Sequence, residues 1–280
     1  HGQMAGPLWR LFMRGRIARM MNKLRSEESG KLTPVQRALL KGPARLRPLT
    51  NTIPKPLLPV GGVPPIVWNL LLLRRHGIVN VMINLHYLGH MIQQEIGDGA
   101  RWGMSISYSP EPVILGTGGG LKAAEEFFEG EDFLVFNSDT LSEVDLGEVL
   151  QLHASRHALA TMVLREDPHV EQWGVIETTQ DNRILTINGR GVQHASNSAF
   201  VQKRMFAGVH ILNPRMLVHC PVGQPSSIID AYVRELECGA TVIGYLDSGY
   251  WSDVGTPERY DQAQKDVEAG RLTLKSRMIE

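Results

Sequence analysis

Over most of its length, the sequence alternates between segments of helical periodicity and short apolar runs. Ile66–Arg75 has a helical pattern that ends at Gly77, and Ile78–Leu85 then has the pattern of a strand. Leu121–Phe128 is again helical and is followed by Phe133–Phe136, a wholly apolar run typical of a strand buried on both faces. This alternation predicts an α/β fold, in which helices flank a mixed, mostly parallel sheet.

The later part of the chain has more strand patterns and fewer helices. Val175–Glu177, Ile184–Ile187 and Phe206–Ile211 are short apolar segments that predict a smaller, β-rich portion. A final helix is expected to begin at Thr256-Pro257, because threonine is a good N-cap and proline suits the first helical position.

The charged residues are distributed unevenly along the chain. Its 280 residues include 29 Lys and Arg and 29 Asp and Glu, which give a formal net charge of zero. Residues 1–55 hold 12 basic and 2 acidic residues, a net charge of +10, so residues 56–280 carry a net charge of −10. The neutral total argues against a uniformly basic nucleic-acid-binding chain. The asymmetry leads us to divide the chain into a basic N-terminal extension, residues 1–30, and a main domain, residues 31–280.

The sequence lacks the patterns of membrane-spanning and disulfide-rich proteins. Its longest apolar runs, such as Leu70–Leu73, are far shorter than the roughly 20 residues that span a bilayer. Its two cysteines, Cys220 and Cys238, have no Cys-x-x-Cys spacing and predict neither a disulfide framework nor a zinc site. We therefore expect a cytoplasmic protein, and the oligomeric state, including a homo-oligomer, stays open.

The basic extension contains a segment, Pro7–Arg25, whose apolar and charged residues predict an amphipathic helix. Three roles are open for it. The helix docks on the acidic main domain; or Arg10, Arg14, Arg16 and Arg19 bind a regulatory ligand such as a cyclic dinucleotide; or the helix rests on an anionic membrane surface. Docking is the simplest of the three, because it needs only the charge asymmetry of the chain.

Two short strings suit the binding of phosphate groups. Arg45-Leu46-Arg47-Pro48-Leu49-Thr50 and the nearby Lys55 place cations in a loop made rigid by proline. Leu115-Gly116-Thr117-Gly118-Gly119-Gly120-Leu121-Lys122 opens a helix with glycines, which allow a ligand to approach the backbone N–H groups closely.

Two aspartates suit the binding of a metal ion. Asp139 follows the buried apolar run Phe133–Phe136, at the edge of the sheet where α/β proteins bind ligands. Asp253 stands in a tight turn before the final helix, where a lone aspartate would otherwise be read as a helix cap. If the two converge, they would hold Mg²⁺, which prefers oxygen ligands and keeps substrate phosphates in its coordination shell.

In this order, the strings resemble those of the sugar-phosphate nucleotidyltransferases, which include mannose-1-phosphate guanylyltransferases and glucose-1-phosphate thymidylyl- and uridylyltransferases. The resemblance runs from about Arg45 to Tyr260. It implies a Rossmann-like nucleotide-diphospho-sugar transferase fold, with the β-rich portion on the sugar side. It also implies a Mg²⁺-dependent reaction in which a sugar 1-phosphate attacks the α-phosphorus of a nucleoside triphosphate and releases pyrophosphate.

The resemblance implies roles for individual residues. Arg45 matches the family arginine on the triphosphate, and Lys55 matches the lysine that holds the reacting phosphates. Asp139 and Asp253 match the metal-binding pair. The residues that match positions against the nucleotide and the sugar are Gly116, Thr117, Gly118, Gly119, Glu177 and Gly208.

The chain departs from the family pattern just before Arg45. The family has a loop of the form A-A-G-x-G-T-R, whereas Lys41 and Pro43 replace both glycines here and Ala44 replaces the threonine. Proline has no N–H group to offer a phosphate. The segment before this loop, residues 33–41, begins with a capping box typical of a helix, whereas the family has a strand there; both readings stay open.

The altered loop leaves two functions open. One is an active enzyme that transfers a nucleoside monophosphate from a nucleoside triphosphate to a sugar 1-phosphate. The alternative is a catalytically degenerate relative that binds a nucleotide, a nucleotide-sugar or a cyclic dinucleotide as a regulatory sensor. Retention of Arg45, Lys55, Asp139 and Asp253 favours the enzyme. The sequence of Lys41–Ala44 and the added basic N-terminal segment favour the sensor.

Overall fold

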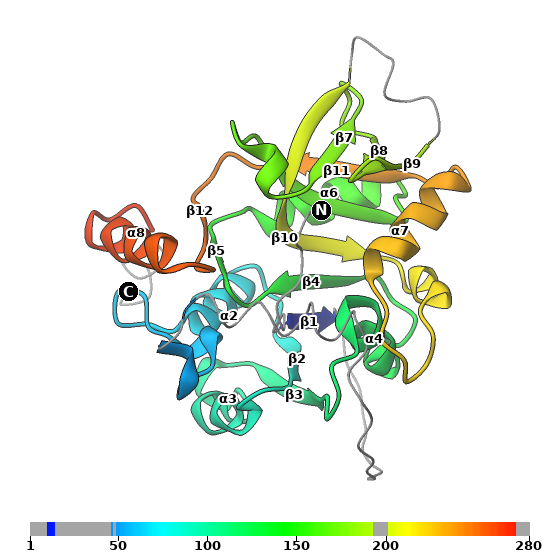
Figure 1. Cartoon of the computed structure of the whole chain (residues 1–280). Helices are drawn as coiled ribbons and strands as arrows, with labels where there is room; N and C mark the ends of the chain where they lie inside the picture. The colour runs from blue at the N-terminus through cyan, green and yellow to red at the C-terminus, as the bar shows by residue number, and fades with distance from the viewer. Residues whose placement is uncertain (1–9, 15–45, 47–48, 193–200, 273–280) are drawn as a thin grey trace.

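The computed structural model describes residues 10–14, 46, 49–192 and 201–272, and for residues 10–14 it describes the backbone alone. Ten of the described strands form one sheet (Figure 1). The strands of its main part, in spatial order, are β3 (Ser105–Pro110), β2 (Asn80–Leu85), β1 (Arg10–Arg14), β4 (Phe133–Asn137), β10 (Gln202–Leu212), β6 (Ala160–Arg165) and β11 (Val242–Leu246).

The directions of these strands make the sheet mixed. β2 pairs with β3 and β6 pairs with β11 in parallel, whereas β1 and β10 are antiparallel to the strands on both sides of them. It follows that β2, β3, β4, β6 and β11 share one direction. The predicted α/β fold with a mixed, mostly parallel sheet is therefore confirmed.

A smaller antiparallel part continues from the first half of β10. It consists of β7 (Val175–Thr178), β8 (Ile184–Ile187) and β9 (Arg190–Gly191). This is the β-rich portion that the sequence predicted. A separate two-stranded ribbon is formed by β5 (Thr140–Ser142) and β12 (Trp251–Asp253).

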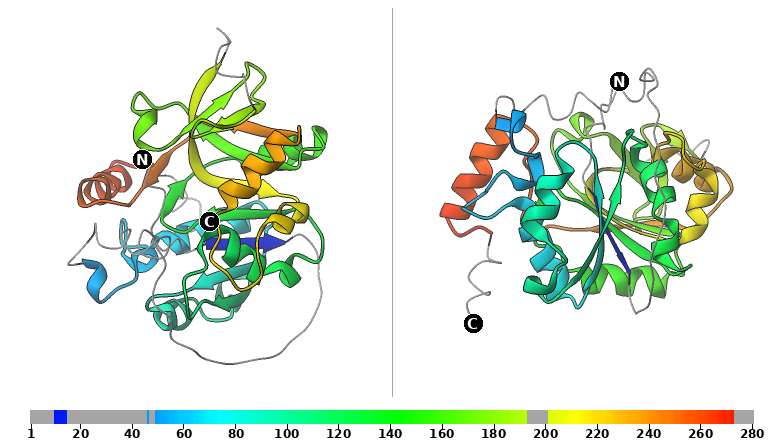
Figure 2. Two further views of the ribbon diagram at one scale, coloured as in Figure 1. Left: turned by 45° about the vertical axis from the view of Figure 1, so that its right-hand side comes forward. Right: turned by 90° about the horizontal axis from the view of Figure 1, so that it is seen from below.

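Helices lie on both sides of the sheet (Figure 2, right). α2 (Pro65–Arg75), α3 (Gly89–Ile96), α6 (Leu146–Ser155) and α8 (Pro257–Glu268) contribute to one hydrophobic core. α4 (Gly116–Ala123), α5 (Glu125–Phe128) and α7 (Ile228–Glu237) contribute to a second. Along β4, Leu134 and Phe136 belong to the first core and Phe133 and Val135 to the second. Successive side chains of a strand point to opposite faces, so a strand covered on both sides must be apolar throughout.

The amphipathic helix predicted over Pro7–Arg25 is wrong for its described residues. Arg10–Arg14 form β1, which pairs with β2 on one side and β4 on the other. Three consecutive apolar residues, Leu11-Phe12-Met13, suit a central strand, and pairing along both edges outweighs a helical periodicity of the sequence. Five residues of the predicted basic extension are therefore part of the sheet.

Several sequence predictions fall outside the described residues. These are the fold of residues 33–41, the loop Lys41–Ala44, and the positions of Arg16, Arg19 and Arg45. Arg10 and Arg14 are the first and last residues of β1, and a regulatory ligand for their side chains stays a prediction. Among the helices that the structure describes, none is long and apolar enough to cross a membrane.

His153, buried in α6, makes the stability of the fold sensitive to mild acid. Its Nδ1 lies 2.8 Å from Thr161 Oγ1, and its Nε2 lies 3.3 Å from Asp132 Oδ2. Burial lowers the pKa of His153 below its ordinary value of 6.5, against the opposing effect of Asp132. The unfolded chain therefore takes up this proton at higher pH than the folded protein does. The free energy of unfolding consequently falls as the pH drops below about 6.5.

We expect His153→Asn to remove this part of the pH dependence. The stability advantage of the original protein over the variant should be largest near about pH 7.5 and should shrink toward about pH 5. Urea unfolding at a series of pH values measures this difference. His157→Asn is the matched control, because His157 is exposed and its φ of 46° suits asparagine. A stability difference for His153→Asn that does not vary with pH would contradict the assignment.

Candidate functional site

The ribbon of β5 and β12 brings together two aspartates that are far apart in the sequence. Asp139 lies between the end of β4 and the start of β5, and Asp253 is the last residue of β12. In the ribbon, Asp253 lies opposite Thr140, the residue after Asp139. The N–H of Val254 also donates to the carbonyl oxygen of Asp139, at 3.2 Å. The predicted convergence of the two aspartates therefore follows from strand pairing.

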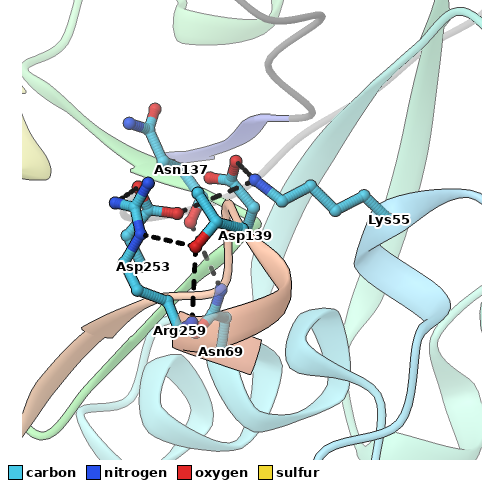
Figure 3. A network of polar contacts seen from close by, with 7 residues as sticks. Lys55, Asn69, Asn137, Asp139, Asp253 and Arg259 are labelled. Carbon is cyan, nitrogen blue, oxygen red and sulfur yellow. Dashed lines mark hydrogen bonds and ion pairs between the residues drawn. The ribbon is translucent and has the colours of Figure 1, made fainter. Parts of the chain in front are cut away.

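Lys55 lies between these two carboxylates (Figure 3). It is the first residue of a short 3₁₀ helix, Lys55–Leu57, in the proline-rich loop. Its Nζ donates to Asp139 Oδ2 at 2.5 Å and lies 3.8 Å from Asp253 Oδ1. The exposed fractions of the Lys55, Asp139 and Asp253 side chains are 14%, 16% and 25%, so water screens their charges only in part.

A second cation, Arg259, belongs to the cluster. It was not identified from the sequence. Its Nη1 lies 2.9 Å from Asp253 Oδ2, and its guanidinium carbon lies 4.7 Å from the centre of the Trp173 ring. Trp173 in turn makes an edge contact with Trp251, with ring centres 5.2 Å apart. The available signal was an arginine in the first turn of the predicted final helix. Two cations and two carboxylates thus alternate across the site.

The donor set of this cluster fits Mg²⁺. Asp139 and Asp253 offer carboxylate oxygens, and Mg²⁺ is commonly held by one or two carboxylates together with substrate phosphates and water. The ammonium of Lys55 shows that the space between the two carboxylates suits a positive charge. Within the described ranges, no group of three or more His, Cys, Asp or Glu side chains could hold a metal by itself. A metal here would therefore share its coordination with a substrate.

Gly208 lies against the residues on either side of Asp139. It is in an irregular stretch of β10 between Phe206 and His210, where its φ is +84°. A Cβ atom at this position would lie 3.0 Å from both Asn137 Nδ2 and Thr140 Oγ1. The absence of a side chain at Gly208 therefore allows β10 to approach the residues on either side of Asp139.

We expect Gly208→Ala to lower the free energy of unfolding by about 1–3 kcal/mol, because alanine is strained at this φ and crowds Asn137 and Thr140. We also expect kcat to fall, because Asp139 lies between the two crowded residues. Thermal unfolding and an activity assay measure both effects. The control is Gly130→Ala, where φ is +78° but nothing lies within 4 Å of the added Cβ. Equal stability losses in the two variants, with unchanged kcat, would contradict the crowding argument.

The glycine-rich string forms the start of α4 and packs against the segment before α7. The N–H groups of Gly118 and Gly119 donate to the carbonyl oxygen of Ser226, at 2.9 and 3.4 Å, and Thr117 Oγ1 accepts from the N–H of Ile228 at 2.6 Å. A Cβ atom would lie 2.9 Å from Cys220 Sγ at Gly118 and 2.6 Å from the Gln224 carbonyl oxygen at Gly119. The glycines therefore permit close packing, and their contact with a nucleotide, like that of Gly116, stays a prediction.

Glu111 anchors the beginning of the same string and was not identified from the sequence. Its carboxylate is 7% exposed and accepts hydrogen bonds from Asn84 Nδ2, at 2.8 Å, and from the N–H of Leu115, at 3.2 Å. It thereby connects the end of β2 to the residue before α4. The signal in the sequence was an acidic residue between two prolines, Pro110 and Pro112.

Glu177 lies in β7, where its Oε2 accepts a hydrogen bond from Thr186 Oγ1 of β8 at 2.6 Å. None of the contacts described for it joins it to Lys55 or to either aspartate. Trp173, four residues before Glu177 in the sequence, does reach the cluster through Arg259. A role for Glu177 on the sugar side stays a prediction.

Comparisons with known proteins agree with this arrangement. The family model described as nucleotidyl transferase matches residues 42–270. An N-acetylmuramate alpha-1-phosphate uridylyltransferase from Neisseria meningitidis is 35% identical over 225 residues, which cover 79% of this chain and 92% of that protein. A mannose-1-phosphate guanylyltransferase from Mycobacterium tuberculosis is 30% identical over 237 residues, which cover 81% of this chain but only 62% of that protein.

A solved structure shares the fold. HddC from Yersinia pseudotuberculosis, complexed with GMP-PN, superposes with a TM-score of 0.64 at 22% sequence identity. The match covers 80% of this chain and 94% of that one. At this level of identity, the likeness is one of architecture.

Proposed function

Because this chain belongs to the nucleotidyl transferase family, we propose that it transfers a nucleoside monophosphate from a nucleoside triphosphate to a sugar 1-phosphate. A phosphate oxygen of the sugar 1-phosphate attacks the α-phosphorus, and pyrophosphate leaves. The observation that carries the proposal is the position of Lys55 between Asp139 and Asp253. The chain spans about 60% of the length of some of the curated relatives that it matches.

Catalysis in this reaction consists mainly of positioning and of neutralising charge. When the triphosphate binds, the ammonium of Lys55 would donate to a phosphate oxygen instead of to Asp139. The carboxylate and the phosphate are both anionic acceptors, so either can accept this hydrogen bond. Asp139 and Asp253 would hold Mg²⁺, which neutralises phosphate charge when bound. Arg259 bonds to one oxygen of Asp253, and the other oxygen lies 3.8 Å from Lys55 Nζ.

The nucleotide and the sugar would bind on either side of this cluster. On the nucleotide side, the family resemblance assigns Arg45 and the residues Gly116 to Gly119, whose position Glu111 fixes through Leu115. On the sugar side, it assigns Glu177 and Gly208, of which Gly208 lies next to the Asp139 loop. The relatives include both guanylyl- and uridylyltransferases, so triphosphates of several bases are tested in the assay below.

The alternative function, binding of a nucleotide without turnover, has less support. It rested on the altered sequence of Lys41–Ala44, which lies outside the described residues. Lys55, Asp139 and Asp253 lie together, and the matched relatives carry the names of enzymes. These observations favour turnover.

The test is release of pyrophosphate by the full 280-residue chain with Mg²⁺. The triphosphates should include GTP, UTP and dTTP, each combined with mannose 1-phosphate, glucose 1-phosphate and N-acetylmuramic acid 1-phosphate. The proposal expects release with at least one pair and loss of release when EDTA is added. No release with any pair, together with calorimetric binding of a nucleotide, would favour the sensor instead.

A further inference from the structure

Helix α8 contacts both Asp253 and the loop that follows Lys55. It begins at Pro257, four residues after Asp253, with Thr256 as the N-cap whose Oγ1 accepts from the N–H of Arg259. This confirms the helix start predicted from the sequence. Its first turn carries Arg259, which pairs with Asp253. Tyr260, also in the first turn, and Gln264, one turn later, bond to the loop after Lys55.

Two side chains of α8, Gln264 and Tyr260, bond to the loop that follows Lys55. Gln264 Oε1 accepts from the N–H of Gly61 at 2.8 Å, and Gln264 Nε2 donates to the carbonyl oxygen of Pro59 at 2.7 Å. The hydroxyl of Tyr260 donates to the same carbonyl at 2.7 Å. The Pro59 carbonyl oxygen and the Gly61 N–H are thus both bonded to side chains of α8.

The turn is also close to Lys55 along the chain and fixed at its other side. Only Leu58 separates Lys55–Leu57 from Pro59, and Val60, which is fully buried, pairs with Val63 across the turn. Trp68 Nε1 donates to the Val60 carbonyl oxygen at 3.1 Å. Val60 is held by Val63 and Trp68, whereas Pro59 lies on the side of the turn nearer Lys55. A displacement of Pro59 by loss of the Gln264 contacts would therefore move the backbone that carries Lys55.

We propose that α8 sets the separation between Lys55 and Asp253, and that Gln264 is a positioning residue that acts through the Pro59–Gly61 turn on Lys55. Arg259 fixes the other end of the same helix to Asp253. The inference rests on the proposed nucleotidyl transfer. Its physical basis is that phosphoryl-group chemistry depends on the placement of charge, where a shift of about 1 Å can cost roughly 100-fold in rate.

The test replaces Gln264 by leucine, which keeps the size of the side chain and removes both hydrogen bonds. We expect kcat to fall by about tenfold, with a smaller change in KM for the triphosphate, because Lys55 is displaced but present. Gln264→Glu keeps the acceptor for the Gly61 N–H and loses the donor to the Pro59 carbonyl. Its kcat should therefore lie between those of the original chain and Gln264→Leu. Gln262→Leu is the matched control, since Gln262 is on the same helix and, within the part of the chain that the structure describes, bonds only to Asp266 of that helix.

A double-mutant cycle separates positioning from general loss of structure. In a Lys55→Met background, Gln264→Leu should cause no further loss of kcat, because the group that it positions is gone. An equal tenfold loss in both backgrounds would overturn the proposal. Thermal unfolding of each variant checks that it is folded.

A readout that needs no activity keeps this inference distinct from the proposed reaction. Lys55 is 14% exposed and bonded to Asp139, so acetylation of Lys55 by an amine-reactive ester should be slow in the original chain and faster in Gln264→Leu. Mass spectrometry of the labelled peptide measures the rate. Faster labelling in an inactive protein would support the positioning role while refuting the enzyme. Equal labelling of Lys55 in both proteins would refute the positioning role even if the enzyme is active.

Discussion

Replacing Lys55 by methionine should lower kcat for pyrophosphate release by roughly 10²–10³-fold, the cost of removing one preorganised donor that stabilises developing charge. Methionine preserves the length and apolar stem of the side chain and removes the ammonium that lies 2.5 Å from Asp139 Oδ2. The effect should be on kcat more than on KM, because this charge is used where the transferred phosphate gains negative charge.

Lys203→Met is the control for this variant. Lys203 lies on β10 and pairs with Glu171 at 3.7 Å, away from the two aspartates, so its loss removes a lysine without removing the cluster. Circular dichroism and thermal unfolding show whether each variant is folded. A folded Lys55→Met protein with the kcat of the original chain would rule out Lys55 as the group that holds the reacting phosphates.

Replacing Asp139 by asparagine should lower kcat by about 10³-fold, which corresponds to the several kcal/mol that a bound metal contributes to such a transition state. Asparagine has the same shape but lacks the charge that a Mg²⁺ ligand supplies. The half-saturating Mg²⁺ concentration should rise as well. Binding of Mn²⁺, followed by electron paramagnetic resonance, measures the metal site without any turnover.

Asp145→Asn is the matched control, because Asp145 caps α6 by accepting from the N–H groups of Gly147 and Glu148 and asparagine caps a helix equally well. It makes the same chemical change at a position outside the site. Unchanged Mn²⁺ binding in Asp139→Asn would show that the metal is held elsewhere.

The sequence predicted much of this site. Lys55, Asp139 and Asp253 each stood in a string whose local character was clear: a rigid loop, the end of a buried strand, and the turn before a helix. Strand pairing between β5 and β12 then brings the two aspartates together, as the resemblance implied. Their convergence could be predicted because each residue is placed by the nearby backbone, and because the order of elements along the chain fixes the edge of the sheet at which they meet. Their roles as a lysine for phosphate and a metal pair stay predictions.

The residues that were missed act across long distances in the sequence. Glu111 bonds to Asn84 and Leu115, Arg259 stacks on Trp173, and Gln264 bonds to Pro59 and Gly61. Nothing in the local sequence of a glutamine on a helix states which turn it will face. Each of these side chains is ordinary in its own segment and gains its role only from the partner that packing supplies.

The first strand shows the same limit for backbone structure. Local periodicity predicted a helix for Pro7–Arg25, yet Arg10–Arg14 lie between β2 and β4. A short apolar run satisfies either structure, and the hydrogen bonds offered by two neighbouring strands decide between them.

Periodicity and turn chemistry were therefore sufficient for the α/β class, the β-rich portion and the start of α8, because these depend on neighbours a few residues away. The four ordered strings were sufficient to identify Lys55, Asp139 and Asp253 as one candidate site. Only the tertiary structure placed Arg10–Arg14 in the sheet, Arg259 on Asp253 and Gln264 on the turn after Lys55. Those contacts join segments that meet only after the chain has folded, and their energies depend on distances that no local pattern records.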